Sequence, residues 1–188
     1  MAALGAAGRE VVETREPGGS PGAEEIRELL IHGEVGRWDA LSEALLHFAA
    51  RRDHVVRIIK PALAEGEWVL CDRFADSTMA YQGYGHGLGR EVIERIYEIT
   101  VGDLKPDLTV VLDLPVEEGL SRAEARNKGG TRYERMDAAF HERLREGFLE
   151  IAQGDPARCL IVDATAPIKK VRETIKAAVQ GRLGVTLS

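Results

Sequence analysis

The sequence predicts an α/β protein: a three-layer, mostly parallel sheet with helices on both faces. Three short apolar runs, 68–71, 107–114 and 159–163, have the length and composition of buried strands. Segments with helical periodicity separate these runs, and strands that alternate with helices are typical of parallel sheets. The chain has 188 residues with no internal repeat or interdomain linker, so we expect one domain over residues 1–188.

The remaining elements follow from local signals. Residues 2–7 resemble the end of a helix closed by Gly8, and a strand over 10–14 runs into a loop rich in glycine and proline. The long helix is expected to pause at Pro61, because proline lacks a backbone donor. Helices are predicted over residues 24–31, 40–63, 91–100, 116–126, 132–153 and 168–179, with a bend at 83–89 and a mobile polar segment at 127–131.

Composition narrows the class of protein. Apolar residues make up 44% and charged residues 30%, as in soluble globular proteins. The net charge of −6 argues against a nucleic-acid polymer or an anionic membrane as the main partner. Cys71 and Cys159 lie inside apolar runs and are expected to be reduced and buried, with no disulfide or metal site. With no signal peptide or spanning stretch apparent, we expect a cytoplasmic protein.

The stretch from Cys71 to Gly83 carries the clearest chemistry. Asp72 and Arg73 come where the 68–71 strand ends, and ligands of parallel sheets bind beyond the carboxyl ends of the strands. The arginine can bind a phosphate in a bidentate manner, and the aspartate can hold Mg²⁺ or a water of its shell. The polar side chains that come after them can contact a polar ligand. The alternative is a strand-end salt bridge beside a solvated loop.

A set of short motifs extends this stretch along the chain. In chain order they are Thr14-Arg15-Glu16-Pro17-Gly18-Gly19, Arg27, His47-Phe48-Ala49-Ala50-Arg51, Asp72-Arg73, Tyr81-Gln82-Gly83, Phe140-His141-Glu142-Arg143 and Gly147-Phe148. Each motif alone is weak, but the ordered set resembles the bacterial thymidylate kinases, from about Ala2 to the C-terminus. The resemblance implies a P-loop nucleoside monophosphate kinase-like fold and transfer of the γ-phosphoryl group of ATP to dTMP, with Mg²⁺. It also implies a homodimer formed through helices beside the long second one.

The resemblance assigns roles to individual residues. Arg27 and Arg73 are implied to hold the dTMP phosphate. Arg51 lies one helical turn after His47, and in the family an arginine and an aromatic residue at this spacing bind and stack on thymine. Phe48 with Arg52 is an alternative register. The implied substrate-binding residues are Arg15, Pro17, Arg27, His47, Phe48, Arg51, Arg73, Ser77, Thr78, Tyr81 and Gln82.

Catalytic and cofactor roles are implied in the same way. The catalytic residues would be Arg73, Asp72, Glu16 and Arg132, and Asp72 and Glu16 would be the Mg²⁺ ligands. A lid over about 122–136 would close over the ATP phosphates, because a basic segment can neutralise developing charge and exclude water. Its implied cations are Arg122, Arg126 and Arg132, with Lys128 and Arg135 nearby. The alternative is a solvated charged helix surface. Thr131 stands where the family often has Asp.

One family feature is missing from this sequence. The family begins with a central strand and a Gly-x-x-x-x-Gly-Lys-Ser/Thr loop that binds the ATP phosphates. No such motif occurs here, and the glycine-containing run 83–89 lacks the Lys-Ser/Thr ending. Without that central strand, we expect the 68–71 and 107–114 strands either to meet directly or to leave open edges. We also expect residues 1–188 alone to be poorly soluble or loosely packed, with no ATP-dependent activity. A truncated or mis-assigned start, with Met1 an internal methionine, is the favoured explanation. The alternatives are a catalytically inactive nucleotide-binding or scaffolding protein, and a kinase for another nucleoside or nucleotide.

Overall fold

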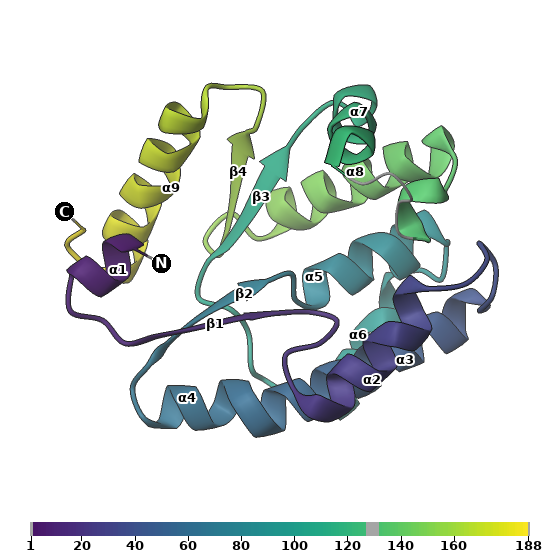
Figure 1. Ribbon diagram of the computed structural model, residues 1–188, viewed down its shortest axis with the longest axis horizontal. Coiled ribbons are helices and arrows are strands. Elements are labelled where there is room, and N and C mark those ends of the chain that lie inside the picture. Colours follow the sequence, from purple (N-terminus) through teal and green to yellow (C-terminus); the bar gives the residue numbers. More distant parts are fainter. Residues whose placement is uncertain (1, 127–131, 188) are drawn as a thin grey trace.

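The computed structural model describes residues 2–126 and 132–187 (Figure 1). Within these residues the chain forms two pairs of parallel strands surrounded by helices. The strands are β1 (Val11–Arg15), β2 (Trp68–Asp72), β3 (Thr109–Asp113) and β4 (Cys159–Asp163). All four lie at or within two residues of the predicted positions. β2, β3 and β4 are short apolar runs, and β1 lies directly before the loop rich in glycine and proline. The prediction of an α/β fold with parallel strands is confirmed.

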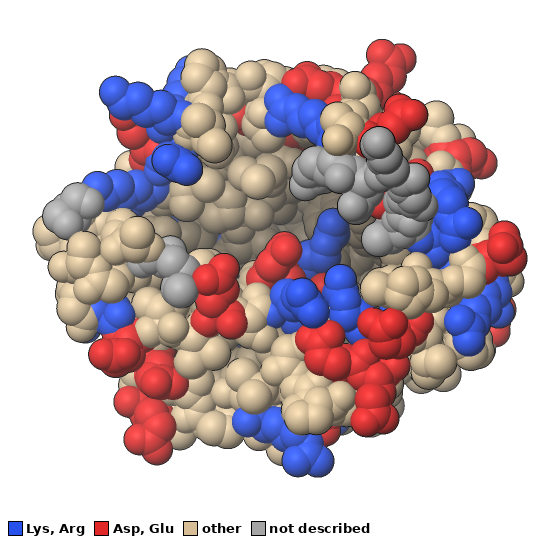
Figure 2. Space-filling view, in the orientation of Figure 1, with Lys and Arg blue, Asp and Glu red and all other residues tan. Residues whose placement is uncertain are grey.

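The two strand pairs are separate. β1 pairs with β2, with Val11 opposite Trp68 and Arg15 opposite Asp72. β3 pairs with β4, beginning with Thr109 opposite Cys159. Among the described residues no ladder joins β2 to β3, so the predicted sheet consists of two halves with open edges between them, which is one of the two arrangements expected from the sequence. Figure 2 shows that this face is hollowed between the two halves and that the visible floor of the hollow is largely uncharged.

Helices cover the strand pairs (Figure 1). Two segments, η1 and η2, are π-helical and η3 is a 3₁₀ turn. The helical elements are α1 (Ala2–Ala6), α2 (Pro21–Ile31), α3 (Ala40–His54), η1 (Val55–Ile59), α4 (Lys60–Ala64), α5 (Ala75–Thr78), η2 (Met79–Gly85), α6 (Arg90–Thr100), α7 (Val116–Arg126), η3 (Tyr133–Arg135), α8 (Ala138–Gly154) and α9 (Ile168–Leu183). No described helix is long and apolar enough to cross a membrane.

Two helices are longer than predicted, since α2 begins at Pro21 and α9 ends at Leu183, and three further elements differ in form. The 40–63 helix contains the π-helical turn η1 just before Pro61, since proline cannot donate to the α-helical ladder. The 132–153 helix is interrupted at Asp137, whose carboxylate accepts a 2.7 Å hydrogen bond from the Phe140 backbone N–H and so begins α8 as its N-cap. The expected 83–89 bend is helical up to Gly85, because η2 continues to that residue. The predicted mobile segment 127–131 lies outside the described residues.

The main hydrophobic core joins α3, η2, α6 and α8. Its buried members are Ala44, Phe48, Met79, Ala80, Ile93, Val101, Phe140, Leu144 and Ile151. Gly85 allows a close approach, because a Cβ atom there would lie 2.7 Å from the Phe140 ring. This packing holds the segment after β2 firmly between α3 and α8. The polar side chains of η2 are therefore presented from a rigid element.

Candidate functional site

A cavity of about 200 Å³ lies beyond the carboxyl ends of β1 and β2. The loop after each strand contributes to it, together with α2, α3, η2 and the segment around η3. Ten residues predicted from the sequence line this cavity: Glu16, Pro17, Arg27, His47, Arg51, Arg73, Ser77, Thr78, Tyr81 and Gln82. Residues from five separate motifs therefore converge on one site, at the place where parallel α/β proteins bind ligands.

Two guanidinium groups mark one part of the cavity. Arg27 donates a 2.7 Å hydrogen bond from Nη1 to the Pro17 carbonyl oxygen. Arg73 lies directly after β2. Its φ of 71° makes it the only non-glycine residue with a positive φ among the described residues. Such a conformation costs about 1–3 kcal/mol and is concentrated at ligand sites. The Arg73 guanidinium lies 5.4 Å from the centre of the Tyr81 ring. Two cations in one cavity favour an anionic ligand.

The buried part of the cavity contains a hydrogen-bond donor and an acceptor without partners. Arg51 is 2% exposed; its Nε donates to Glu16 Oε2 at 2.7 Å and its Nη2 to Thr78 Oγ1 at 3.1 Å. Gln82 is fully buried and its Nε2 donates to Glu43 Oε1 at 2.7 Å. Arg51 Nη1 and Gln82 Oε1 are buried and have no hydrogen-bond partner among the described residues. Buried polar groups are normally paired, so these two atoms indicate a ligand.

His47 lies between this polar region and the segment around η3. Its Nε2 is 2.8 Å from the Tyr133 hydroxyl. Burial, and then the charge of Arg51, lowers the pKa of His47 from 6.5 to about 3, so the ring is neutral near pH 7. A neutral imidazole can pack against a planar ligand without carrying charge.

The alternative register places Phe48 and Arg52 elsewhere. Phe48 is fully buried in the main core, where its ring packs 4.8 Å from the Arg51 guanidinium. Arg52 donates to the Thr100 carbonyl oxygen at 3.1 Å. Neither residue lines the cavity. The structure therefore places the register of His47 and Arg51, and not that of Phe48 and Arg52, at the site.

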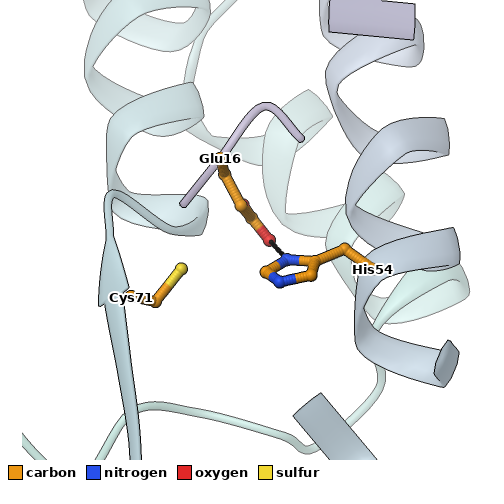
Figure 3. Close-up of side chains that lie close together, drawn as sticks. All are labelled: Glu16, His54 and Cys71. Atoms are coloured by element: carbon orange, nitrogen blue, oxygen red, sulfur yellow. Dashed lines mark hydrogen bonds and ion pairs between the residues drawn. The ribbon is translucent and has the colours of Figure 1, made fainter. Parts of the chain in front are cut away.

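Glu16 lines the cavity and holds Arg51 in position. Its Oε2 accepts from Arg51. Its Oε1 lies 3.0 Å from His54 Nδ1, and Figure 3 shows these two side chains pointing toward each other. Cys71 completes a cluster whose potential ligand atoms all lie within 4.8 Å of one another. Burial, and then the charge of Glu16, raises the pKa of the Cys71 thiol, and a thiol that keeps its proton is a poor metal ligand. Both Glu16 oxygens already have one hydrogen-bond partner, so the Mg²⁺ role of Glu16 stays a prediction that would use the remaining lone pairs or require one of these contacts to open.

Asp72 suits a hard cation better. It ends β2, it is exposed, and its carboxylate has no side-chain hydrogen bond or ion pair with the described residues. It does not line the cavity itself. Carboxylate oxygens at a strand end are suitable ligands for Mg²⁺ or for a water of its shell.

The other predicted cations lie outside the cavity. Arg15 forms an exposed ion pair with Glu24 at 3.1 Å. Arg122 pairs with Glu118 at 2.5 Å and donates to the Ala164 carbonyl oxygen. Arg135 donates to the Gly33 carbonyl oxygen. Lys128 lies outside the described residues, and the side chain of Arg126 is not among the described ones.

Arg132 differs most from its predicted placement. Only 1% of it is exposed, and its guanidinium forms an ion pair with Glu43. Its Nε also donates to the Leu30 carbonyl oxygen at 3.1 Å. In this conformation Arg132 balances a buried carboxylate, and it would have to leave Glu43 to reach an ATP phosphate. The physical reason is that a buried carboxylate without a cation is costly.

Sequence reasoning missed five lining residues: Ile31, Phe74, Tyr133, Glu134 and His141. Tyr133 packs edge-on against Tyr81, with ring centres 5.3 Å apart. His141 has a buried Nε2 without a partner among the described residues, and burial lowers its pKa. A signal existed for His141, since it belongs to the Phe140–Arg143 motif, to which we assigned no role.

Comparison with known proteins is consistent with this geometry. The family model for thymidylate kinase matches residues 1–175. A thymidylate kinase of Caulobacter vibrioides is 54% identical over 182 residues, covering 97% of this chain and 87% of that protein. One of Nitrobacter hamburgensis is 50% identical, covering 96% and 79%. A crystal structure of thymidylate kinase from Ehrlichia chaffeensis superposes with a TM-score of 0.69 at 37% identity, covering 89% of this chain and 79% of that one.

Proposed function

This chain belongs to the thymidylate kinase family, and we propose that it transfers the γ-phosphoryl group of ATP to dTMP to give dTDP, in dTTP biosynthesis. The comparisons do not favour the alternatives of an inactive scaffold or a kinase for another nucleotide. The side chains that line the cavity support assigning the base and the phosphate of dTMP to separate groups of residues.

One observation carries the assignment of the base site. Arg51 Nη1 is a buried donor without a partner among the described residues, and Gln82 Oε1 is a buried acceptor in the same situation. Thymine presents the complementary pair on one edge, the O4 acceptor and the N3–H donor. We propose that Arg51 donates to O4, that Gln82 accepts from N3–H, and that His47 packs against the ring. Thr78, which accepts from Arg51, and Ser77, Tyr81 and Pro17 complete the pocket.

The phosphate of dTMP is assigned to Arg27 and Arg73. Phosphoryl transfer requires positioning and charge neutralisation more than covalent chemistry by the protein. Two arginines that line one cavity supply both, because a guanidinium binds phosphate oxygens in a bidentate manner. The positive φ of Arg73 supports this role, because strained backbone conformations of this kind are concentrated at ligand sites.

The residues that would contact ATP and its Mg²⁺ ion are proposed from their charge alone. Asp72 is our proposed ligand for Mg²⁺ or its water, and the ion would neutralise charge on the transferred group. Arg122, Arg126 and Arg132 remain our proposal for cations of a lid over about 122–136. Arg132 can serve there only in a state in which its ion pair with Glu43 is broken.

We further propose a homodimer that acts in the cytoplasm. Exposed apolar side chains lie on the helical layer of α3, η1 and α6: Leu45, Val56, Val92 and Ile99, with exposures of 50%, 45%, 37% and 84%. Exposed apolar side chains on helices that pack against one another support an interface on these helices. Sedimentation at several concentrations measures the association directly.

The experiment that tests the function measures dTDP formation from dTMP and ATP, with dCMP in parallel. Because residues 1–188 contain no Gly-x-x-x-x-Gly-Lys-Ser/Thr loop, we expect turnover only when that loop is supplied, and dTMP binding in either case. Calorimetric titration of dTMP, dCMP and thymidine tests the substrate site independently of the ATP site. We expect dTMP to bind more tightly than dCMP by at least about tenfold, since two hydrogen bonds are mismatched for cytosine. Equal binding of the two nucleotides would contradict the assigned base site.

A further inference from the structure

Glu43 lies behind the base site and has no role in the function assigned so far. It is fully buried on α3, one turn before His47. Its Oε1 accepts from Gln82 Nε2 at 2.7 Å and lies 3.4 Å from His86 Nε2. Its Oε2 is paired with Arg132. One carboxylate thus connects the proposed base-reading residue with the arginine that precedes η3.

The ionisation of Glu43 restricts the Gln82 side chain. Burial by itself would raise the pKa of Glu43, but the neighbouring His86 imidazole and the Arg132 guanidinium together lower it to about 2. The carboxylate is therefore ionised near neutral pH and can only accept hydrogen bonds. The amide of Gln82 must then turn its Nε2 toward Glu43. Its Oε1 is left as the group without a partner among the described residues.

We propose that Glu43 is a specificity-determining residue that acts through Gln82. By accepting from the amide nitrogen, it leaves only the amide oxygen for the nucleobase, and an oxygen there selects a base with N3–H. Thymine has that donor, whereas cytosine has an acceptor at N3. Glu43 touches no substrate in this scheme, so it is a positioning residue. The inference rests on the proposed function, because it assumes that the ligand is a pyrimidine nucleotide.

The substitution Glu43→Gln reverses this restriction while keeping the size of the side chain. The introduced amide has one oxygen and one nitrogen. The oxygen should turn toward Arg132, because a charged guanidinium donates a stronger hydrogen bond than the neutral Gln82 amide. The introduced nitrogen then faces Gln82, whose amide must turn to present its own oxygen to it. Gln82 now offers Nε2–H to the base, which conflicts with the N3–H of thymine and suits N3 of cytosine.

The test is calorimetric titration of the full chain with dTMP and dCMP. We expect E43Q to lower the ratio of dTMP to dCMP affinity by about 10- to 100-fold, mainly through weaker dTMP binding. In a Q82L background the same substitution should leave the ratio unchanged, because the amide through which Glu43 acts is gone. Asp76→Asn is the matched control: it alters a part-buried pair with Arg158, outside the cavity, and should lower thermal stability without changing the ratio.

The possible outcomes distinguish the role of Glu43 from the proposed function. If the wild-type chain itself does not prefer dTMP, the proposed function fails. If the wild type prefers dTMP and folded E43Q keeps the same ratio, the inference about Glu43 is overturned. Should E43Q unfold because Arg132 has lost its charged partner, Glu43→Asp keeps a negative charge for Arg132, but its shorter side chain draws the carboxylate away from Gln82. The freed amide should then lower the ratio, and a folded E43D with the wild-type ratio would overturn the inference. An altered ratio in D76N would likewise contradict a specific role for Glu43.

Discussion

Tyr133 and His47 are separated by 86 positions in the sequence, yet the Tyr133 hydroxyl lies 2.8 Å from His47 Nε2. The contact joins the segment around η3 to the helix that carries Arg51 and Glu43. Both residues line the cavity, so the wall of the proposed thymine site is built from two distant parts of the chain. A change in either residue should therefore alter nucleotide binding.

Removal of the Tyr133 hydroxyl should weaken dTMP binding without abolishing it. In Tyr133→Phe the ring is kept, but His47 loses its partner, and a single hydrogen bond of this kind contributes about 0.5–1.5 kcal/mol. We expect a loss of dTMP affinity of about 2- to 12-fold, measured by calorimetry. Tyr97→Phe, which removes a hydroxyl bound to the Leu104 carbonyl oxygen away from the cavity, is the matched control. Unchanged affinity in Y133F would mean that the hydrogen bond does not position His47.

Arg73→Ala tests the phosphate clamp. We expect it to weaken dTMP binding by about 2–4 kcal/mol, because a charge-assisted contact with the phosphate is lost. Thymidine has no phosphate, so its affinity should change far less. Arg52→Ala, which removes an arginine outside the cavity, should leave both affinities unchanged. Equal losses for dTMP and thymidine in R73A would show that Arg73 acts structurally.

His47 should make the stability of the protein depend on pH. Its pKa is about 3 in the folded chain and 6.5 when unperturbed, so between these values the unfolded chain binds a proton that the folded chain does not. Stability should therefore fall as the pH is lowered from about 6.5 towards 3. Denaturant unfolding of the wild type and of His47→Phe over this range isolates the effect, since the other groups cancel in the difference. A difference between the two proteins that does not change with pH would contradict a His47 imidazole that stays neutral in the folded chain.

The open edges of β2 and β3 should make residues 1–188 prone to association when they are produced alone. Leu70 on β2 and Leu112 on β3 are 44% and 56% exposed, and unpaired apolar strand edges pair with other chains. We expect species larger than a dimer in size-exclusion chromatography, reduced in Leu70→Lys/Leu112→Lys because charged edges resist pairing. Ile99→Lys controls for added charge outside the strands. A monodisperse dimer with a cooperative melt would contradict this prediction.

Short stretches of sequence were sufficient to predict the strands and the site residues that lie in recognisable motifs. The 159–163 strand was predicted with its observed bounds, since five residues of apolar character between turns have few alternatives. Arg27, Arg51, Arg73 and Gln82 were identified because the ordered short motifs that contain them resemble those of the thymidylate kinases; for Arg73 its position directly after the 68–71 strand was a further sign. These relationships depend on neighbours a few residues away, and the amino-acid sequence displays them.

The tertiary structure decided which groups pair with the buried charges. Glu43 has the appearance of an ordinary polar residue on an amphipathic helix, and Arg132 that of a lid cation. They are 89 positions apart, and only the packing of α3 against the segment around η3 buries them together. The same packing places Tyr133 in the cavity wall. Asp137 begins α8 as its N-cap, and so interrupts the helix predicted over 132–153. Once burial removes water, a charge must be paired by whatever group the fold brings near, and that group is not encoded by sequence spacing.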